Sequence, residues 1–234
     1  RTVEHGLVGR EEWKRIEKEL AAATCHDDGG ICAFNGTGNS SRHLTAALGF
    51  VPPYVDYLTA APSADCLDAV AAGIIGLCGR DEYRVTEILR RNIRNGIFVH
   101  AALTCSTNLT LHIVAAMLYA GFTFSLDDFE AILHEVPTGI PEIIDYSLTG
   151  GRDIFALARQ REAGAFGGMD TVMFELNLLG IPVDLDAPTV TGTSWRDRID
   201  AFTQRRGRPP QPELVTENPV VVHPPHRPKS GIKV

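Results

Sequence analysis

The stretch IFVHAALTCSTN, residues 97–108, decides the fold class that the sequence predicts. Its first seven residues are an apolar run rich in β-formers, which is typical of a buried strand. The polar turn 104–108 follows, and a helix with apolar spacing then extends to Gly121. Such a unit places its turn at the carboxyl edge of a sheet, where α/β proteins bind ligands. We therefore expect an α/β fold, a layered domain with a mostly parallel sheet.

A glycine-rich loop, GGICAFNGTGNSS at residues 29–41, lies upstream of this unit. Cys32 leads into it, a helix follows in which Asn39 or Ser40 is expected to be the N-cap, and Gly49 is placed to end that helix. Cysteine thiolates suit iron–sulfur clusters and zinc, while the backbone N–H groups of such a turn suit a carboxylate or phosphate. The pairing suggests a metal beside an anion site, although a lone cysteine is more often a buried apolar residue.

Composition narrows the classes of partner. The chain has 234 residues, with 22 basic and 29 acidic side chains and a net charge of -7, so we expect small-molecule or protein partners and no nucleic acid. No apolar run reaches the roughly 20 residues of a membrane span, and no secretion signal begins the chain, so we expect a cytoplasmic protein. The five cysteines form no metal-binding pair of the zinc-finger kind.

The rest of the chain predicts one domain and a linker. We expect a strand and turn at 189–193 and a charged helix, 195–204, capped by Ser194 and facing solvent. Seven prolines fall between residues 208 and 228, which indicates a linker and places the domain boundary at 207/208. Further helices are expected over 11–23, 64–78, 85–93, 126–133 and around 172–176.

Three segments resemble the dihydroxy-acid and 6-phosphogluconate dehydratase family. They occur in the family's order, as GICAFNGTGNSSRHLTAALGFVPP (30–53), ALTCSTNLTLHIVAAMLYAGFTFSLDDFEAI (102–132) and DAPTVTGTS (186–194). The similarity extends from about residue 7 to 202, as the central part of a full-length enzyme. It implies a partial α/β dehydratase domain over 1–207, with the start of a C-terminal β domain in 208–234. Members dehydrate 2,3-dihydroxy acids or sugar acids to 2-keto acids with an iron–sulfur cluster and Mg²⁺, and this chain looks most like the aldonate dehydratases.

The resemblance assigns roles to particular residues. Cys32 matches a cluster ligand, of a 2Fe-2S or 4Fe-4S centre, and the general base is not identified. His112 is interpreted as a core histidine rather than a base. The residues implied to bind an acidic substrate are Thr37, Ser106, Thr107 and Asn108, for the last three of which plain helix capping is the alternative.

The sequence also departs from the family pattern. Thr104 and Cys105 replace two glycines, so we expect the pocket to be altered or filled. The family's other cluster cysteines and its magnesium ligands have no match in the aligned region. A non-catalytic remnant or interaction subunit is therefore the alternative to an enzyme, and an acid-binding protein without a metal is a third possibility. In each case we expect a homo-oligomer, most simply a dimer.

Overall fold

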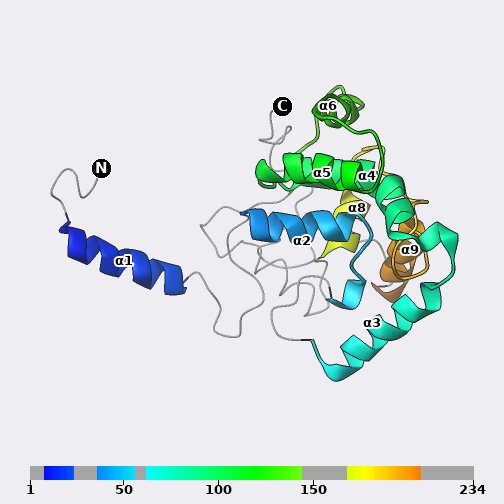
Figure 1. Ribbon diagram of the computed structural model, residues 1–234, viewed down its shortest axis with the longest axis horizontal. Coiled ribbons are helices and arrows are strands. Elements are labelled where there is room, and N and C mark those ends of the chain that lie inside the picture. The colour runs from blue at the N-terminus through cyan, green and yellow to red at the C-terminus, as the bar shows by residue number, and fades with distance from the viewer. Residues whose placement is uncertain (1–7, 24–35, 56–61, 144–167, 207–234) are drawn as a thin grey trace.

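The computed structural model describes residues 8–23, 36–55, 62–143 and 168–206, and every regular element in these ranges is helical (Figure 1). Cys32 and the proline-rich segment lie outside them. The elements are α1 (Arg10–Ala23), α2 (Thr37–Ala47), η1 (Pro53–Val55), α3 (Ala64–Leu77), η2 (Asp81–Tyr83), α4 (Val85–Ala102), α5 (Asn108–Tyr119), α6 (Leu126–His134), α8 (Met169–Leu178) and α9 (Trp195–Arg206). No helix in the described ranges has the length and apolar character needed to cross a bilayer.

The expected strand at 97–103 is wrong, because α4 continues through it from Val85 to Ala102. Residues 95–102 are all buried, so the apolar run marks a helix packed on every side rather than a strand. Periodicity alone does not separate these two environments for a short apolar run. Gly96 lies within the helix, where an added Cβ would come within 2.9 Å of the Leu48 side chain.

The parallel sheet therefore finds no support in the described ranges and stays a prediction for the rest of the chain. The expected strand at 189–193 is also wrong, because this segment is a turn closed by an isolated antiparallel bridge between Pro188 and Ser194. The expected helices are confirmed, and Ser125 caps α6 through a capping box with Asp128. The proposed domain boundary lies beyond the described residues.

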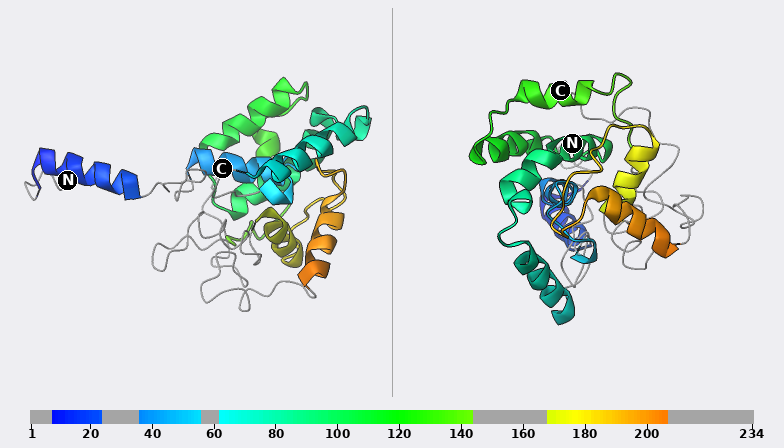
Figure 2. Two further views of the ribbon diagram at one scale, coloured as in Figure 1. Left: turned by 90° about the horizontal axis from the view of Figure 1, so that it is seen from below. Right: turned by 90° about the vertical axis from the view of Figure 1, so that its right-hand side faces the viewer.

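Helix α4 forms the centre of the packing (Figure 2). One side of it contributes Phe98, Val99 and Leu103 to a cluster that contains α8 and Trp195. The other side contributes Leu89, Ile93 and Ile97 to a cluster with α2, α5 and α6. Gly96 has no side chain, so α2 approaches α4 closely at this point. This contact brings the beginning of α2 beside the end of α4.

Four helices end in the same backbone motif. At Gly49, Gly121 and Gly180 the chain adopts a positive φ, and two N–H groups bond back into the last turn of the helix. Gly49 thus ends α2 as predicted. At the end of α4 the same place is taken by Thr104, with φ 47°, the sole non-glycine residue with positive φ in the described ranges. The backbone there keeps the conformation that a glycine would favour.

Helix α9 does not form the solvated face expected of it. Ser194 does cap it, but Trp195, Arg198 and Ile199 are buried. Arg198 forms a buried ion pair with Asp170 of α8 at 2.7 Å. The charged residues of α9 therefore include one that belongs to the interior, a distinction that composition does not reveal.

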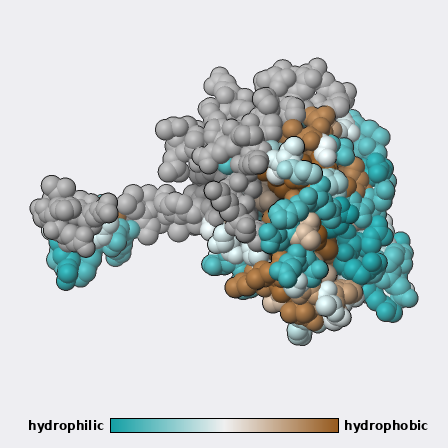
Figure 3. All heavy atoms as spheres, turned by 90° about the horizontal axis from the view of Figure 1, so that it is seen from above, coloured by the Kyte–Doolittle hydropathy of each residue, from teal (hydrophilic) through white to brown (hydrophobic). Residues whose placement is uncertain are grey.

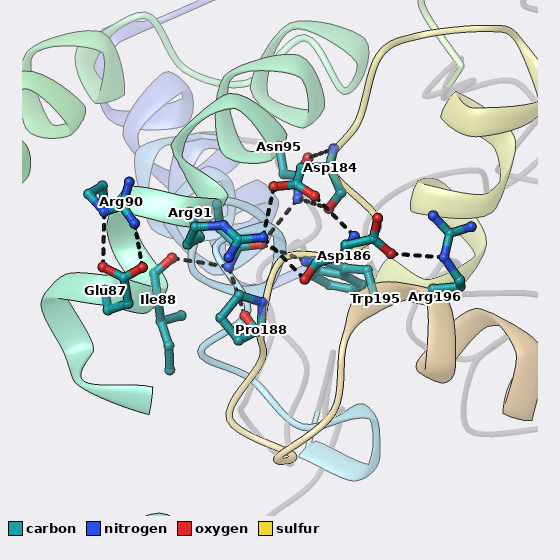
Figure 4. A network of polar contacts seen from close by, with 11 residues as sticks. Glu87, Ile88, Arg90, Arg91, Asn95, Asp184, Asp186, Pro188, Trp195 and Arg196 are labelled. Carbon is teal, nitrogen blue, oxygen red and sulfur yellow. Dashed lines mark hydrogen bonds and ion pairs between the residues drawn. The ribbon is translucent and has the colours of Figure 1, made fainter. Parts of the chain in front are cut away.

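Two asparagines of α4 fasten the segment that precedes α9. Asn95 donates to the carbonyl of Asp184 at 2.9 Å and accepts from its N–H at 2.7 Å (Figure 4). Asn92 donates to the Pro188 carbonyl at 2.8 Å and accepts from Trp195 Nε1 at 2.7 Å. The third family-like segment is held in place by this network.

Candidate functional site

Three of the predicted substrate-binding residues meet in space. Thr37 Oγ1 and Ser106 Oγ lie 3.0 Å apart, and Asn108 Nδ2 donates to Thr37 Oγ1 at 3.2 Å. Thr37 is the first residue of α2 and Asn108 the first of α5. The first and second family-like segments therefore contact each other through the side chains predicted to bind substrate.

Ser106 is held at each of its polar groups. Its N–H donates to Ser40 Oγ at 2.9 Å, and its carbonyl oxygen lies 3.0 Å from His100 Nε2 and 3.0 Å from the N–H of Leu109. Its hydroxyl contacts Thr37. Ser40 and His100 are both buried, so the turn before α5 is fixed from beneath while its outer side faces solvent.

The expected N-cap of α2 is wrong, because the helix begins earlier, with Gly36 as N-cap. Asn39 and Ser40 lie inside the helix and are buried. Neither Gly36 nor Thr107, the N-cap of α5, makes a side-chain capping hydrogen bond. Two helix N-termini, each with a partial positive charge, thus meet at Thr37 and Asn108.

The alternative role as plain caps is not supported for these residues. Thr107 is exposed at the N-cap position without a capping bond, and the Ser106 hydroxyl contacts Thr37 instead of its own helix. His112, one turn further along α5, is exposed, so its interpretation as a core histidine is wrong. It lines a groove together with Thr37.

That groove has a volume of about 660 Å³ and runs between α2, the start of α4 and α5. Thr37, Ser41 and His112 supply polar groups, and Leu44, Leu48, Phe50, Leu89 and Leu109 are among its apolar lining. Several large apolar side chains of α3 and α5 are exposed, and Figure 3 shows apolar patches interrupting the hydrophilic surface on one face. The site therefore borders a mainly apolar surface.

Burial lowers the pKa of both histidines beneath the site. The pKa of His43, in α2, is lowered to about 3 by burial first and by the charge of Arg42 second. The pKa of His100 is also lowered by burial, which outweighs the opposing effect of its bond to the Ser106 carbonyl. Both rings are therefore neutral near pH 7.

The thiols that the structure places do not form a cluster-binding set. Cys66 and Cys78 lie at either end of α3, about 18 Å apart at a rise of 1.5 Å per residue. Cys105 is 3% exposed and belongs to the apolar core. Within the described ranges no group of three His, Cys, Asp or Glu could hold a metal ion.

The third family-like segment lies away from the Thr37 contact, at the other end of α2. The N–H of Val190 donates to the carbonyl of Gly49 at 2.8 Å, and an added Cβ on Gly49 would lie 3.1 Å from the Pro188 carbonyl oxygen. The hydroxyls of Thr189, Thr191 and Thr193 follow one another at 2.7 and 2.8 Å. Among the described residues this segment packs against the fold rather than joining the site.

Sequence reasoning missed Ser40 and His100. Ser40 has a weak signal, because it lies three residues after Thr37 and so shares a face of the helix. The strand expected at 97–103 gives the His100 side chain a different direction from the one it has in α4. Its position near the end of α4, before the connection to α5, carries no recognisable motif.

Comparisons with known proteins agree with the motifs. The family model described as dihydroxy-acid/6-phosphogluconate dehydratase N-terminal matches residues 1–198. The chain is 31% identical over 209 residues to a dihydroxy-acid dehydratase of Nitratidesulfovibrio vulgaris (strain DP4), covering 84% of this chain and 34% of that protein. It is 32% identical over 196 residues to the D-xylonate dehydratase of Escherichia coli (strain K12), covering 81% and 28%.

A 6-deoxy-6-sulfo-D-gluconate dehydratase of Pseudomonas putida is 28% identical over 166 residues, covering 67% of this chain and 28% of that protein. The chain thus spans about a third or less of the length of these relatives. The family model, by contrast, covers most of the chain. The chain therefore belongs to the dihydroxy-acid/6-phosphogluconate dehydratase family.

Proposed function

We propose that this chain forms the substrate-binding part of a hydro-lyase, an iron–sulfur-dependent dehydratase that converts a 2,3-dihydroxy carboxylic acid or sugar acid to a 2-keto-3-deoxy acid. The printed names of its relatives include dehydratases of dihydroxy acids, of D-xylonate and of 6-deoxy-6-sulfo-D-gluconate. Because the chain spans about a third of their length, activity and substrate both belong to the proposal.

The contact between Thr37 and Ser106 carries the proposal. It joins two segments that lie 69 residues apart and that both belong to the family pattern, at a distance of 3.0 Å. The side chains involved are small and polar, and they sit where two helix N-termini meet. This combination favours an anionic ligand with several oxygen atoms.

The three side chains suit the oxygen atoms of a hydroxy acid. The hydroxyls of Thr37 and Ser106 can donate or accept, and the amide of Asn108 adds both donor and acceptor. The two helix N-termini favour the carboxylate. Dehydration removes the C2 proton and the C3 hydroxyl, so residues that fix the carboxylate also fix the C2–C3 bond relative to the groups that react. Thr107, exposed beside them, completes the proposed set.

Cys32 is proposed as one ligand of the iron–sulfur cluster, which would supply a Lewis acid for the departing hydroxyl, and Mg²⁺ as the second cofactor. Cys32 lies four residues before Gly36, so it precedes the beginning of α2 directly. The described residues do not by themselves fit a cluster or a magnesium site, since no group of three suitable side chains occurs among them. We therefore assign no step to either cofactor.

A second candidate function is that of a non-catalytic subunit of the same family. It is favoured by the shortage of metal-binding side chains among the described residues and by the one-third coverage of the relatives. Such a subunit would bind the acid, or a partner protein, without converting it. The exposed Leu111, Leu118 and Tyr119 of α5 support association in either case, and we propose a homodimer.

Calorimetric titration of the chain with D-xylonate, D-gluconate and a branched 2,3-dihydroxy acid tests the proposal. Binding is expected for at least one acid and is expected to weaken in Thr37→Val, which keeps the shape of the side chain and removes its oxygen. Anaerobic reconstitution with iron and sulfide, followed by an assay for 2-keto acid, then separates the enzyme from the non-catalytic subunit. The absence of binding to all three acids would exclude the hydro-lyase and the acid-binding form of the non-catalytic subunit.

A further inference from the structure

His100 lies beneath the candidate site and has no role assigned by the family pattern. It is on α4 two residues before the end of that helix, and its side chain is fully buried. Its Nε2 is 3.0 Å from the carbonyl oxygen of Ser106. Because a carbonyl oxygen can only accept, Nε2 must carry the proton and the ring must donate to Ser106.

We infer that His100 is a positioning residue, whose Nε2–H holds the Ser106 carbonyl and thereby sets the Ser106 and Asn108 side chains against Thr37. The effect of His100 on substrate binding rests on the proposed function. The contact itself is a property of the fold.

Ser106 lies in the short connection that joins α4 to α5. The chain leaves α4 through Thr104, in the left-handed region at φ 47°, and reaches Ser106 two residues later. Such a short connection has few hydrogen bonds of its own to hold its backbone in one conformation. The bonds from His100 to the carbonyl and from the Ser106 N–H to Ser40 fix both faces of one residue, so its hydroxyl has a defined direction toward Thr37.

The His100 ring is itself held in place by an aromatic contact. Its ring meets Phe129 of α6 edge-on, with centroids 6.0 Å apart and planes at 84°. Phe129 is fully buried, and α6 is anchored at its start by the capping box of Ser125 and Asp128. The ring is therefore also held by packing against α6. A polar contact on one nitrogen and an aromatic contact on the ring determine one orientation.

The other ring nitrogen of His100, Nδ1, makes no comparable contact among the described residues. His100 Nδ1 is buried and has no hydrogen-bond partner among the residues that the structure describes. Burial also lowers the pKa of His100, in agreement with a neutral ring. The useful group is therefore Nε2 alone, and a substitute side chain has to supply a donor at that end of the ring.

This asymmetry provides a matched pair of variants. Glutamine can place its amide nitrogen near the position of Nε2, whereas asparagine is shorter and reaches the position of Nδ1. His100→Gln is expected to keep the bond to Ser106, and His100→Asn to lose it. His100→Met, similar in size and without a donor, is expected to lose it too.

Amide hydrogen exchange of the full chain, followed by NMR, tests the contact without requiring activity. In His100→Met and His100→Asn the turn loses the bond to the Ser106 carbonyl, so it is expected to open more often. The Ser106 amide, which donates to Ser40 Oγ, is then expected to exchange roughly 2- to 12-fold faster. In His100→Gln it is expected to stay near the wild-type rate. The amide of Phe122, bonded to Met117 at the far end of α5, serves as the internal control for folding.

Titration of the same variants with D-gluconate and D-xylonate tests the consequence. Dissociation constants are expected to rise in the Met and Asn variants and to return toward wild type in the Gln variant. If the wild type binds neither acid but the exchange pattern is as expected, the proposed function fails and the positioning role stands. If Ser106 exchange is unchanged in Met and Asn while Phe122 is unaffected, or if Asn protects as well as Gln, the positioning role is overturned.

Discussion

Thr37 and Ser106, 69 residues apart in the chain, bring their hydroxyl oxygens to 3.0 Å from each other. Neither residue is a metal ligand or a charged group, and neither would be chosen from composition. Their contact joins the start of α2 to the turn before α5, which places the two helix N-termini at one point. The candidate site is therefore created by the packing of α2 on α4, the helix that carries this turn at its end.

The first prediction follows from the Thr37 oxygen. Thr37→Val removes the atom that contacts both Ser106 Oγ and Asn108 Nδ2. Because the site is partly exposed and water can replace the lost partner, we expect a loss of about 1 kcal/mol in the free energy of unfolding. Urea denaturation measures it as a lower midpoint at unchanged slope.

The matched control is Thr203→Val in α9, where the hydroxyl donates to the carbonyl of Asp200 in its own helix. Both variants are expected to lose some stability, but Thr37→Val alone should weaken the binding of a hydroxy acid. Equal binding by both variants and the wild type would remove Thr37 from the site.

The second prediction concerns the backbone at Thr104. A residue other than glycine in the left-handed region costs about 1–2 kcal/mol. Glycine costs about 0.5–1 kcal/mol of extra chain entropy. Thr104→Gly is therefore expected to raise the free energy of unfolding by about 0.5–1 kcal/mol, measured by thermal and urea unfolding.

Gly121 offers the reverse substitution at the same place in another helix. Its φ is 88°, and no atom lies within 4 Å of an added Cβ, so Gly121→Thr tests the backbone without a steric clash. It is expected to destabilise the chain by a similar amount. If Thr104→Gly were destabilising while Gly121→Thr behaved as expected, contacts of the Thr104 side chain would outweigh its strain.

The sequence was sufficient for features that depend on local chemistry. The glycine stops at Gly49 and Gly121, and the helix expected at 126–133, depend on residues within a few positions of each other, and the structure confirms them. The helix expected at 85–93 is also present, though it is longer than predicted. Local signals mark where helices begin and end when a specific side chain or glycine is needed there.

Features that depend on distant residues could not be predicted from the sequence. Gly96 lies inside α4 at a position where Leu44 and Leu48 leave no room for a side chain. Nothing near Gly96 in the sequence reveals these neighbours. Trp195 is buried in the cluster that contains α8, and its indole N–H donates to Asn92, which is distant in the sequence, at 2.7 Å. The contact of Thr37 with Ser106 followed from no spacing rule either, and the family resemblance alone suggested that the two segments share a site.

The third prediction concerns the buried ion pair of Arg198 and Asp170. Arg198 Nε and a terminal nitrogen lie 3.0 and 2.7 Å from Asp170 Oδ1, and another donates to the Val51 carbonyl at 3.2 Å. Arg198→Met leaves a buried carboxylate without its cation, so we expect a loss of about 3–5 kcal/mol. Urea denaturation at constant pH measures this loss.

Arg196→Met is the control on the same helix. Its pair with Asp186 is 2.9 Å long but exposed, so its removal is expected to change stability little. The double variant Arg198→Met with Asp170→Leu is expected to recover part of the loss, because no unpaired charge remains in the interior. Equal losses for Arg196→Met and Arg198→Met would contradict the distinction between buried and exposed pairs.

The fourth prediction concerns pH and the buried His43. Its pKa is about 3 in the folded chain against an ordinary value of 6.5, because burial disfavours the charged ring. Above pH 6.5 the ring is neutral in both states and does not affect stability. As pH falls from 6.5 toward 3, the unfolded chain takes up a proton that the folded chain does not, so stability is lost by about 1.4 kcal/mol per pH unit at most. His100, whose pKa is also lowered, adds a loss of the same sign.

Unfolding measured by urea at pH 7.5 and about pH 5 tests this sign. His43→Gln is expected to have a smaller difference in stability between the two pH values than the wild type, because one of the two buried rings no longer titrates. His134→Gln, an exposed substitution on α6 that leaves both buried rings in place, is the matched control for the exchange of a histidine for glutamine. A wild-type chain that became more stable at pH 5 than at pH 7.5, or a His43→Gln variant with an unchanged difference, would mean that His43 is not buried as a neutral ring.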